Sequence, residues 1–224
     1  MSNYKYHFNS INGTQEITIS DGNKKYKGNG TTEFMIFNLP AETTCPFASE
    51  DCKKFCYAKK SERVYKAVRA CRERNYKATL EPEFVPAMVN LICDTLKRNK
   101  YVNAKHIVIR IHEAGDFYSP EYFAAWDRIA GYLRGDTRIT FIAYTKSIPY
   151  IYNGYSANMV ISSSIDDSTL PELIQMTAEK NMKIYKAVPE LSGDPAAKIC
   201  RCEDCGTCFI CMTTKFMLTE CKIH

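Results

Sequence analysis

Short apolar runs alternate with longer amphipathic segments through most of this 224-residue chain. The apolar runs are rich in β-branched and aromatic residues and are typical of strands, whereas the segments between them have the apolar spacing of helices. We expect strands over 34–40, 106–112, 138–146, 158–165 and 182–189, and helices over 59–79, about 82–99, 119–134 and 168–181. Such alternation predicts an α/β fold with a parallel sheet of about five or six strands, either doubly wound or a partial (β/α) barrel.

The same pattern divides the chain into three parts. Residues 1–32 hold one alternating strand, "QEITIS", and the turn-rich "DGNKKYKGNG", which predict a small N-terminal β extension. Residues 33–190 form the predicted core, and residues 191–224 a cysteine-rich segment. Reactive residues of such folds belong at the carboxyl ends of the strands. We therefore expect the loops after all five strands, including the C-terminal cysteines, to gather at one edge.

The composition is typical of a soluble protein in a reducing compartment. The apolar fraction is 45% and the net charge +5, and we see no apolar run of about 18 residues and no apolar stretch of a signal peptide near the N-terminus. We expect a cytoplasmic protein with no membrane contact. Eleven cysteines are many for such a protein, and clustered free thiols in a reducing compartment indicate metal binding.

Three cysteines lie in the loop after the first core strand, in "TCPFASEDCKKFCYA". Cys45, Cys52 and Cys56 have the spacing C-x6-C-x3-C, without the tight pairs of a structural zinc site and without a nearby histidine. Three thiolates suit a 4Fe–4S cluster with one open iron. Zinc with a fourth ligand from elsewhere remains the alternative.

The loop resembles the cluster-binding loop of radical S-adenosylmethionine enzymes, which carries an aromatic residue before its last cysteine, as Phe55 does here. The stretches "CKKFCYA", "RIHEAGDF" and "CEDCGTCF" together look like the phage-encoded gene product 88 family. This resemblance, over roughly residues 33–210, implies that Phe55 or Tyr57 packs near the adenine of S-adenosylmethionine. It also implies that Gly115 and Asp116 receive the amino end of that cofactor.

The strand before "HEAGDF" adds candidate binding residues. Arg110 and His112 alternate with isoleucines and should point to the opposite sheet face, where they could bind a ligand carboxylate or phosphate. The alternative is a structural pair of Arg110 with Glu113 or Asp116. Gly115 permits a close approach of the backbone to a ligand, and Glu113 and Asp116 could accept hydrogen bonds from an ammonium group. Three further candidates end the next two strands: Lys146, Ser162 and Ser164.

A second cysteine group follows the last core strand, in "KICRCEDCGTCFIC". It contains Cys200, Cys202, Cys205, Cys208 and Cys211, with four of them at the repeated C-x2-C spacing of ferredoxin-like cluster loops. The family resemblance favours the first four of the five and the spacing favours the last four. We expect an auxiliary iron–sulfur cluster, with all-cysteine zinc as the alternative.

Ten lysines and arginines lie between Lys53 and Lys77, with tyrosines among them. They could attract a phosphorylated or nucleic-acid substrate, or simply form a solvated helix face. Together these features favour a radical S-adenosylmethionine-type enzyme, served by an electron donor such as flavodoxin or ferredoxin, in the cytoplasm of a host cell. The alternatives are a non-enzymatic zinc or iron–sulfur nucleic-acid-binding protein and an iron–sulfur enzyme with non-radical chemistry.

Overall fold

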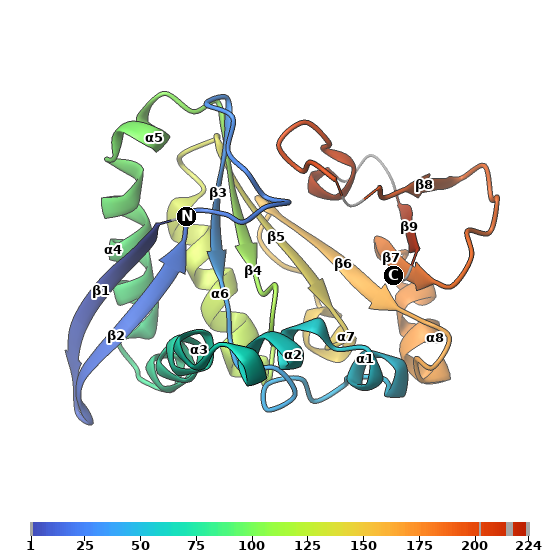
Figure 1. Cartoon of the computed structure of the whole chain (residues 1–224), viewed down its shortest axis with the longest axis horizontal. Coiled ribbons are helices and arrows are strands. Elements are labelled where there is room, and N and C mark those ends of the chain that lie inside the picture. Colours follow the sequence, from blue (N-terminus) through green and yellow to red (C-terminus); the bar gives the residue numbers. More distant parts are fainter. Residues whose placement is uncertain (1, 202, 214–216, 223–224) are drawn as a thin grey trace.

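A nine-stranded sheet organises the computed structural model, which describes residues 2–201, 203–213 and 217–222 (Figure 1). The strand order is β1-β2-β3-β4-β5-β6-β7-β9-β8. The strands are β1 (Asn3–Ser10), β2 (Gly13–Ser20), β3 (Thr32–Phe37), β4 (His106–Ile111), β5 (Ile139–Thr145), β6 (Met159–Ile165), β7 (Ile184–Val188), β8 (Ala197–Ile199) and β9 (Leu218–Lys222). The hairpin β1–β2 and the pair β2–β3 are antiparallel, and every other pair is parallel. The predicted α/β class with a mostly parallel sheet is confirmed.

The helices fall between the core strands, as the amphipathic segments predict. They are α1 (Glu50–Lys54), α2 (Tyr57–Val64), α3 (Lys66–Thr79), α4 (Phe84–Leu96), α5 (Asn99–Val102), α6 (Pro120–Leu133), α7 (Ile148–Ile151), α8 (Pro171–Glu179) and the 3₁₀ turn η1 (Ile210–Met212). Ser119 caps α6, and its hydroxyl accepts a hydrogen bond from the Tyr122 N–H at 3.2 Å. The expected helix over 59–79 is two helices, because the backbone at Tyr65 is extended.

The two faces of the sheet bury different side chains. Ile109, Ile111 and Phe141 point toward α4 and α6, where they pack with Trp126 in the main core. The opposite face, here called the inner face, carries a smaller apolar cluster that includes Phe34, Ile36, Val108, Ile142, Val160 and Met212. Because side chains alternate along strands, the paired row of Ile36, Arg110, Ile142 and Val160 crosses this inner face.

The short helices α1 and α2 lie at the end of the sheet toward which β3–β6 point (Figure 1). The C-terminal cysteines were expected at this edge, and the described ones lie along the inner face, where η1 packs against β5 and β6 and Cys205 meets Tyr26. After β7 the chain returns to start β8, which runs parallel to β9, and the described part of the cysteine segment that follows packs on the inner face. There the Phe209 ring contacts His106, the first residue of β4, at a centroid distance of 5.6 Å.

No helix within the described residues is long and apolar enough to cross a membrane.

Candidate functional site

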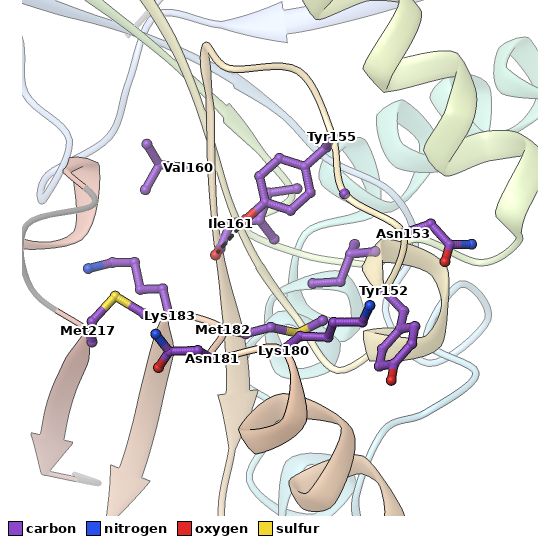
Figure 2. Close-up of a pocket in the computed structure, with 12 residues that line it drawn as sticks. Tyr152, Asn153, Tyr155, Val160, Ile161, Lys180, Asn181, Met182, Lys183 and Met217 are labelled. Atoms are coloured by element: carbon purple, nitrogen blue, oxygen red, sulfur yellow. Dashed lines mark hydrogen bonds between the residues drawn. The ribbon is translucent and has the colours of Figure 1, made fainter.

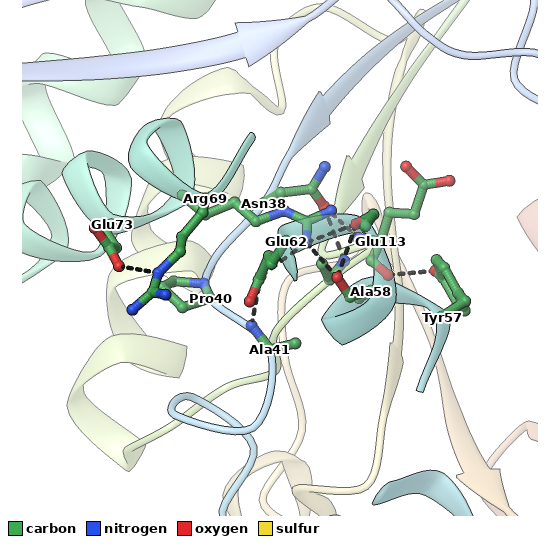
Figure 3. Close-up of polar contacts among 12 residues, drawn as sticks. Asn38, Pro40, Ala41, Tyr57, Ala58, Glu62, Arg69, Glu73 and Glu113 are labelled. Atoms are coloured by element: carbon green, nitrogen blue, oxygen red, sulfur yellow. Dashed lines mark hydrogen bonds and ion pairs between the residues drawn. The ribbon is translucent and has the colours of Figure 1, made fainter. Parts of the chain in front are cut away.

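The cysteine loop, residues 38–56 after β3, is hydrogen-bonded to the loop after β4. The Asn38 side-chain oxygen accepts hydrogen bonds from the N–H groups of Glu113 and Ala114 at 2.7 and 2.9 Å. Figure 3 shows this contact beside the bond that the Tyr57 hydroxyl donates to the Glu113 carbonyl. Gly115 has a φ of +85°, and a Cβ there would lie 2.6 Å from the Thr44 hydroxyl oxygen. The glycine therefore permits close packing of the two loops, in addition to lining the cavity described below.

The three thiols of this loop lie close enough to influence one another. Cys45, Cys52 and Cys56 are all half-buried. Burial raises the pKa of the Cys45 thiol to about 12, and Asp116, Cys52 and Cys56 add to the shift. Burial also raises the pKa of Cys52, which the positive charge of Lys146 opposes. Three neighbouring thiols fit a soft metal centre in donor type. As they stand, no three His, Cys, Asp or Glu side chains of the described residues are arranged to hold a metal ion.

A buried polar network supports the loop from the neighbouring strands. The Lys146 ammonium group lies 2.8 Å from the Asp166 carboxylate, and both side chains are 7% exposed. The Ser49 hydroxyl, at the N-cap of α1, donates to the same carboxylate at 2.6 Å. This connects the cysteine loop to the ends of β5 and β6. Sequence reasoning identified Lys146 but missed Asp166, although a carboxylate directly after a strand was a usable signal.

Asp116 lies in this network as a buried carboxylate. It accepts hydrogen bonds from the Thr145 hydroxyl at 2.5 Å, the Phe117 N–H at 2.7 Å and the Lys146 N–H at 2.9 Å. Burial raises the pKa of Asp116 to about 6, although these hydrogen bonds and the Lys146 charge lower it. With three of about four lone-pair positions used, the carboxylate retains room for one more donor.

A cavity of about 460 Å³ opens on the inner face and gathers many of the predicted residues. Six of the predicted binding residues line it: Tyr57, Arg110, His112, Glu113, Gly115 and Ser164. The remaining walls come from Lys25, Tyr26, Tyr144 and Tyr185, which sequence reasoning missed. Tyr144 and Tyr185 follow the strand alternation and could have been found, whereas Lys25 and Tyr26 lie in a turn-rich segment without periodicity.

The structure does not bring the other predicted residues to the cavity. Ser162 is buried on the inner face in pairing with Tyr144, and Asp116 and Lys146 lie in the polar network. Phe55 is 57% exposed at the end of α1, with the Lys54 ammonium group 5.1 Å from its ring centre.

Arg110 and His112 point to different faces, contrary to the sequence expectation. The His112 ring packs on the core side against Phe117 and Tyr122, and its Nε2 atom lies 2.8 Å from the Tyr122 hydroxyl. The reason is local, because His112 follows the last residue of β4 with a φ of +64°, which ends the strand alternation. Burial, with the Arg110 charge, lowers the pKa of His112 to about 3. His112 is therefore neutral at physiological pH.

Arg110 instead lies on the inner face between two aromatic rings. Its guanidinium carbon is 4.7 Å from the Tyr26 ring centre and 4.8 Å from that of Tyr144. Nε donates to the His112 carbonyl at 3.2 Å, and Nη1 donates to the Tyr26 hydroxyl. Among the described residues no carboxylate lies within 4 Å of the guanidinium nitrogens, so the alternative of an ion pair with Glu113 or Asp116 is not what the structure contains.

The C-terminal cysteines meet the far side of this cavity. The Cys200 and Cys211 side chains are hydrogen-bonded to each other, and Cys211 also contacts the Tyr144 hydroxyl. Cys205 hydrogen-bonds with the Tyr26 side chain, and burial raises the pKa of its thiol to about 11. Cys208 is exposed, and Cys202 lies outside the described residues. Cys221, which was not expected to bind metal, is buried in β9.

Five of the ten basic residues between Lys53 and Lys77 form ion pairs. Lys53, Lys59, Arg69, Arg72 and Arg74 each lie within 4 Å of a carboxylate. The Arg72 guanidinium is buried, 2.8 Å from Glu62, whose carboxylate also accepts the Ala41 N–H at the start of the cysteine loop (Figure 3). These contacts favour the interpretation of the run as a helix face with a structural role.

A second cavity, of about 560 Å³, lies at the amino ends of β6 and β7 (Figure 2). Tyr155, Lys180 and Met182 are among its lining residues. It is formed at the opposite end of the strands from the cysteine loop, and no residue predicted for the site lines it.

The fold and this site define a mixed α/β protein that carries cysteine-bearing segments on a mostly parallel sheet. The chain belongs to the gene product 88 family, whose model, described as "Gene product 88", matches residues 11–213. This part of the sequence prediction is confirmed.

Two curated relatives are phage proteins. The chain is 31% identical over 154 residues to "Gene 88 protein" of Mycobacterium phage L5, and 32% identical over 129 residues to "Gene 88 protein" of Mycobacterium phage D29. These matches cover 63% and 55% of this chain, and 59% and 52% of the relatives. The chain thus spans little more than half the length of these relatives. No solved structure matches it.

Proposed function

We propose that this protein is a radical S-adenosylmethionine-type iron–sulfur enzyme built on a partial (β/α) barrel. The observation that supports the proposal is the proximity of the Cys45, Cys52 and Cys56 thiols at the carboxyl ends of parallel strands, beside the buried Asp116. Enzymes with such sheets use this edge for chemistry. A three-thiol donor set leaves one metal position for a ligand.

In this proposal Cys45, Cys52 and Cys56 hold a 4Fe–4S cluster. When bound, the cluster supplies the electron that cleaves S-adenosylmethionine to methionine and a 5′-deoxyadenosyl radical. The chain's own residues position the loop and the cofactor. Asp116 offers its remaining lone pair to the cofactor amino group, and the Lys146–Asp166 pair holds α1 and its cysteine in place.

The C-terminal cysteines would hold an auxiliary cluster on the other side of the cavity, and the ligands come from Cys200, Cys202, Cys205, Cys208 and Cys211. Cys200 is already within electrostatic range of Cys205 and hydrogen-bonded to Cys211. The electron would come from a small donor protein such as flavodoxin or ferredoxin, in the cytoplasm of the host cell. The substrate is a molecule that fits the cavity between the two cysteine groups.

Anaerobic reconstitution tests this proposal. The purified chain is loaded with iron and sulfide, and both are counted, with about eight of each expected for two 4Fe–4S clusters. S-adenosylmethionine and dithionite are then added, and 5′-deoxyadenosine is measured. The variant Cys52→Ser should lose about half of the iron and all cleavage. The matched control Cys71→Ser changes a half-buried cysteine of α3 and should retain both.

Zinc without labile sulfide would refute the proposal. Iron and sulfide at the Cys52 site without cleavage of S-adenosylmethionine, in the presence of the cell extract that supplies substrate, would favour non-radical chemistry at the open iron. Equal cleavage by Cys52→Ser and the wild type would show that this loop does not hold the cluster.

A further inference from the structure

The inner-face cavity carries an excess of positive charge in an aromatic shell. Of its lining residues, Lys25 and Arg110 are cationic and Glu113 is anionic, which leaves one net positive charge because His112 is neutral. Glu113 accepts a hydrogen bond from Asn23 and does not pair with Arg110. Four tyrosines, at 26, 57, 144 and 185, form much of the wall. A volume of about 460 Å³ is in the range of small-molecule sites.

The Arg110 guanidinium group has N–H bonds that can donate to a ligand in this cavity. A guanidinium group has five N–H bonds, and the described residues accept two of them, through the His112 carbonyl and the Tyr26 hydroxyl. Three N–H bonds remain without an acceptor among those residues. The rings of Tyr26 and Tyr144 hold the guanidinium plane by cation–π contacts, and this fixes the direction of the remaining donors.

A partly buried cation without a carboxylate partner is costly for the folded protein. Arg110 is half-buried, in a cross-strand row whose other members are Ile36, Ile142 and Val160. An apolar residue would pack in that row without the cost of removing a positive charge from water. Stacking on tyrosine offsets part of it, and a bound anion would offset the rest.

Arg110 lies close to both cysteine-bearing segments, because its charge acts on Tyr57 of α2 as well as on Cys205 of the C-terminal group. Lys146 is the cation whose charge acts on Cys52, in the N-terminal trio, whereas Arg110 acts on Cys205 in the C-terminal group. Tyr26 and Tyr144, which stack on Arg110, are the same side chains that contact Cys205 and Cys211. Arg110 therefore lies between the two cysteine groups, stacked on the two tyrosines that contact the second.

We propose that Arg110 binds an oxyanion, a carboxylate or phosphate, of the substrate, with the body of that substrate packed against the tyrosine rings. The assignment to a substrate rests on the proposed function, whereas anion binding by Arg110 does not. The remaining guanidinium N–H bonds donate to the oxyanion, and Lys25 adds a second positive charge at the cavity wall.

Calorimetric titration of the full chain without added iron tests anion binding separately from any cluster. The probes are phenyl phosphate, benzoate and neutral benzyl alcohol, which share an aromatic body and differ in charge. The wild type should bind at least one anion more tightly than the alcohol. Arg110→Gln should weaken anion binding at least about tenfold, which is about 1.4 kcal/mol. The control Arg98→Gln removes an arginine stacked 4.6 Å from the Tyr4 ring centre, outside the cavity, and should bind as the wild type does.

Binding of phenyl phosphate alone would identify a phosphate ligand, and binding of benzoate alone a carboxylate; both results support the proposal. Absence of saturable anion binding to the wild type, or equal binding to Arg110→Gln, would overturn it. If Arg110→Gln does not fold, Arg110→Lys keeps the charge but loses the fork geometry, and weaker binding is again expected. Anion binding without cleavage of S-adenosylmethionine would sink the proposed function alone, and cleavage without anion binding would sink only this inference.

Discussion

Replacing Gly115 with alanine should displace the cysteine loop, because the new methyl group has no space. Its carbon would lie 2.6 Å from the Thr44 hydroxyl oxygen and 2.7 Å from the Leu39 Cβ atom. Thr44 is fully buried and its hydroxyl donates to the Pro40 carbonyl at 2.7 Å, so it cannot turn away without losing that bond. Overpacking of this kind costs about 1–3 kcal/mol.

The backbone adds a second cost at the same position. Gly115 has a φ of +85°, where a residue with a Cβ atom is about 1–2 kcal/mol less stable than glycine. Together the two costs should lower the free energy of unfolding by about 2–5 kcal/mol. For a chain of this length each kcal/mol lowers Tm by about 2–4 °C, so the expected decrease is about 4–20 °C.

Urea and thermal denaturation measure the loss, with Gly30→Ala as the matched control. Gly30 has a φ of +82° and nothing within 4 Å of its added Cβ, so the control should lose only the backbone part, about 1–2 kcal/mol. Thiol alkylation followed by peptide mass analysis should also show faster labelling of Cys45 in Gly115→Ala only. Equal losses of stability in the two variants would refute the reasoning, as would unchanged labelling of Cys45 in a destabilised Gly115→Ala.

Three further predictions concern buried contacts. Lys146→Met leaves the Asp166 carboxylate buried without its partner and should cost about 3–5 kcal/mol in urea denaturation, whereas adding Asp166→Asn should restore part of that loss. The pKa of Asp116 is raised to about 6 from 3.8, so its contribution to the free energy of unfolding is present below pH 4 and is lost as the pH rises through 6. Between pH 4 and 7 the free energy of unfolding of the metal-free wild type should therefore fall by about 3 kcal/mol relative to that of Asp116→Asn. Ser119→Ala removes the cap of α6 and should cost about 1 kcal/mol in thermal denaturation.

Each of these has a result that contradicts it. The Lys146–Asp166 pair carries little energy if the two single losses simply add up in the double variant. The burial argument for Asp116 fails if the pH dependence of wild type and Asp116→Asn is parallel. A Ser119→Ala protein as stable as the wild type would mean that the N-terminus of α6 has another hydrogen-bond partner.

The core of the fold could be predicted because each of its elements carries a local signal. The five strands predicted from apolar runs are β3 to β7, and Ser119 marks the start of α6 through its capping chemistry. The strands β1, β8 and β9 were missed. β8 is only three residues long, whereas β1 alternates Tyr4, Tyr6 and Phe8 with polar residues, a strand signal that the apolar runs alone did not reveal.

The candidate site was only partly predictable, since its contacts depend on tertiary structure. The order of loops brought Cys45 and Asp116 to one edge, as the parallel sheet requires. The single positive φ at His112 reversed a side chain, and no sequence pattern shows such a reversal. Tyr26 reaches the cavity from a segment that precedes the core strands, so its role depends on a long-range contact.

The C-terminal segment on the inner face also determines the order in which parts of the chain can fold during synthesis. A ribosome makes the chain from its N-terminus, and residues up to Thr169 contain the first cysteine loop and the polar network that supports it. The inner-face cluster acquires Met212, and the cavity its contact with Cys211, only about forty residues later. During that interval Val108 and Ile142 lack the cover of Met212, whereas Tyr26 already packs on Phe34. The first cysteine loop and its polar network can therefore fold while the second cysteine group is still being made, and the inner face stays partly uncovered until Met212 arrives.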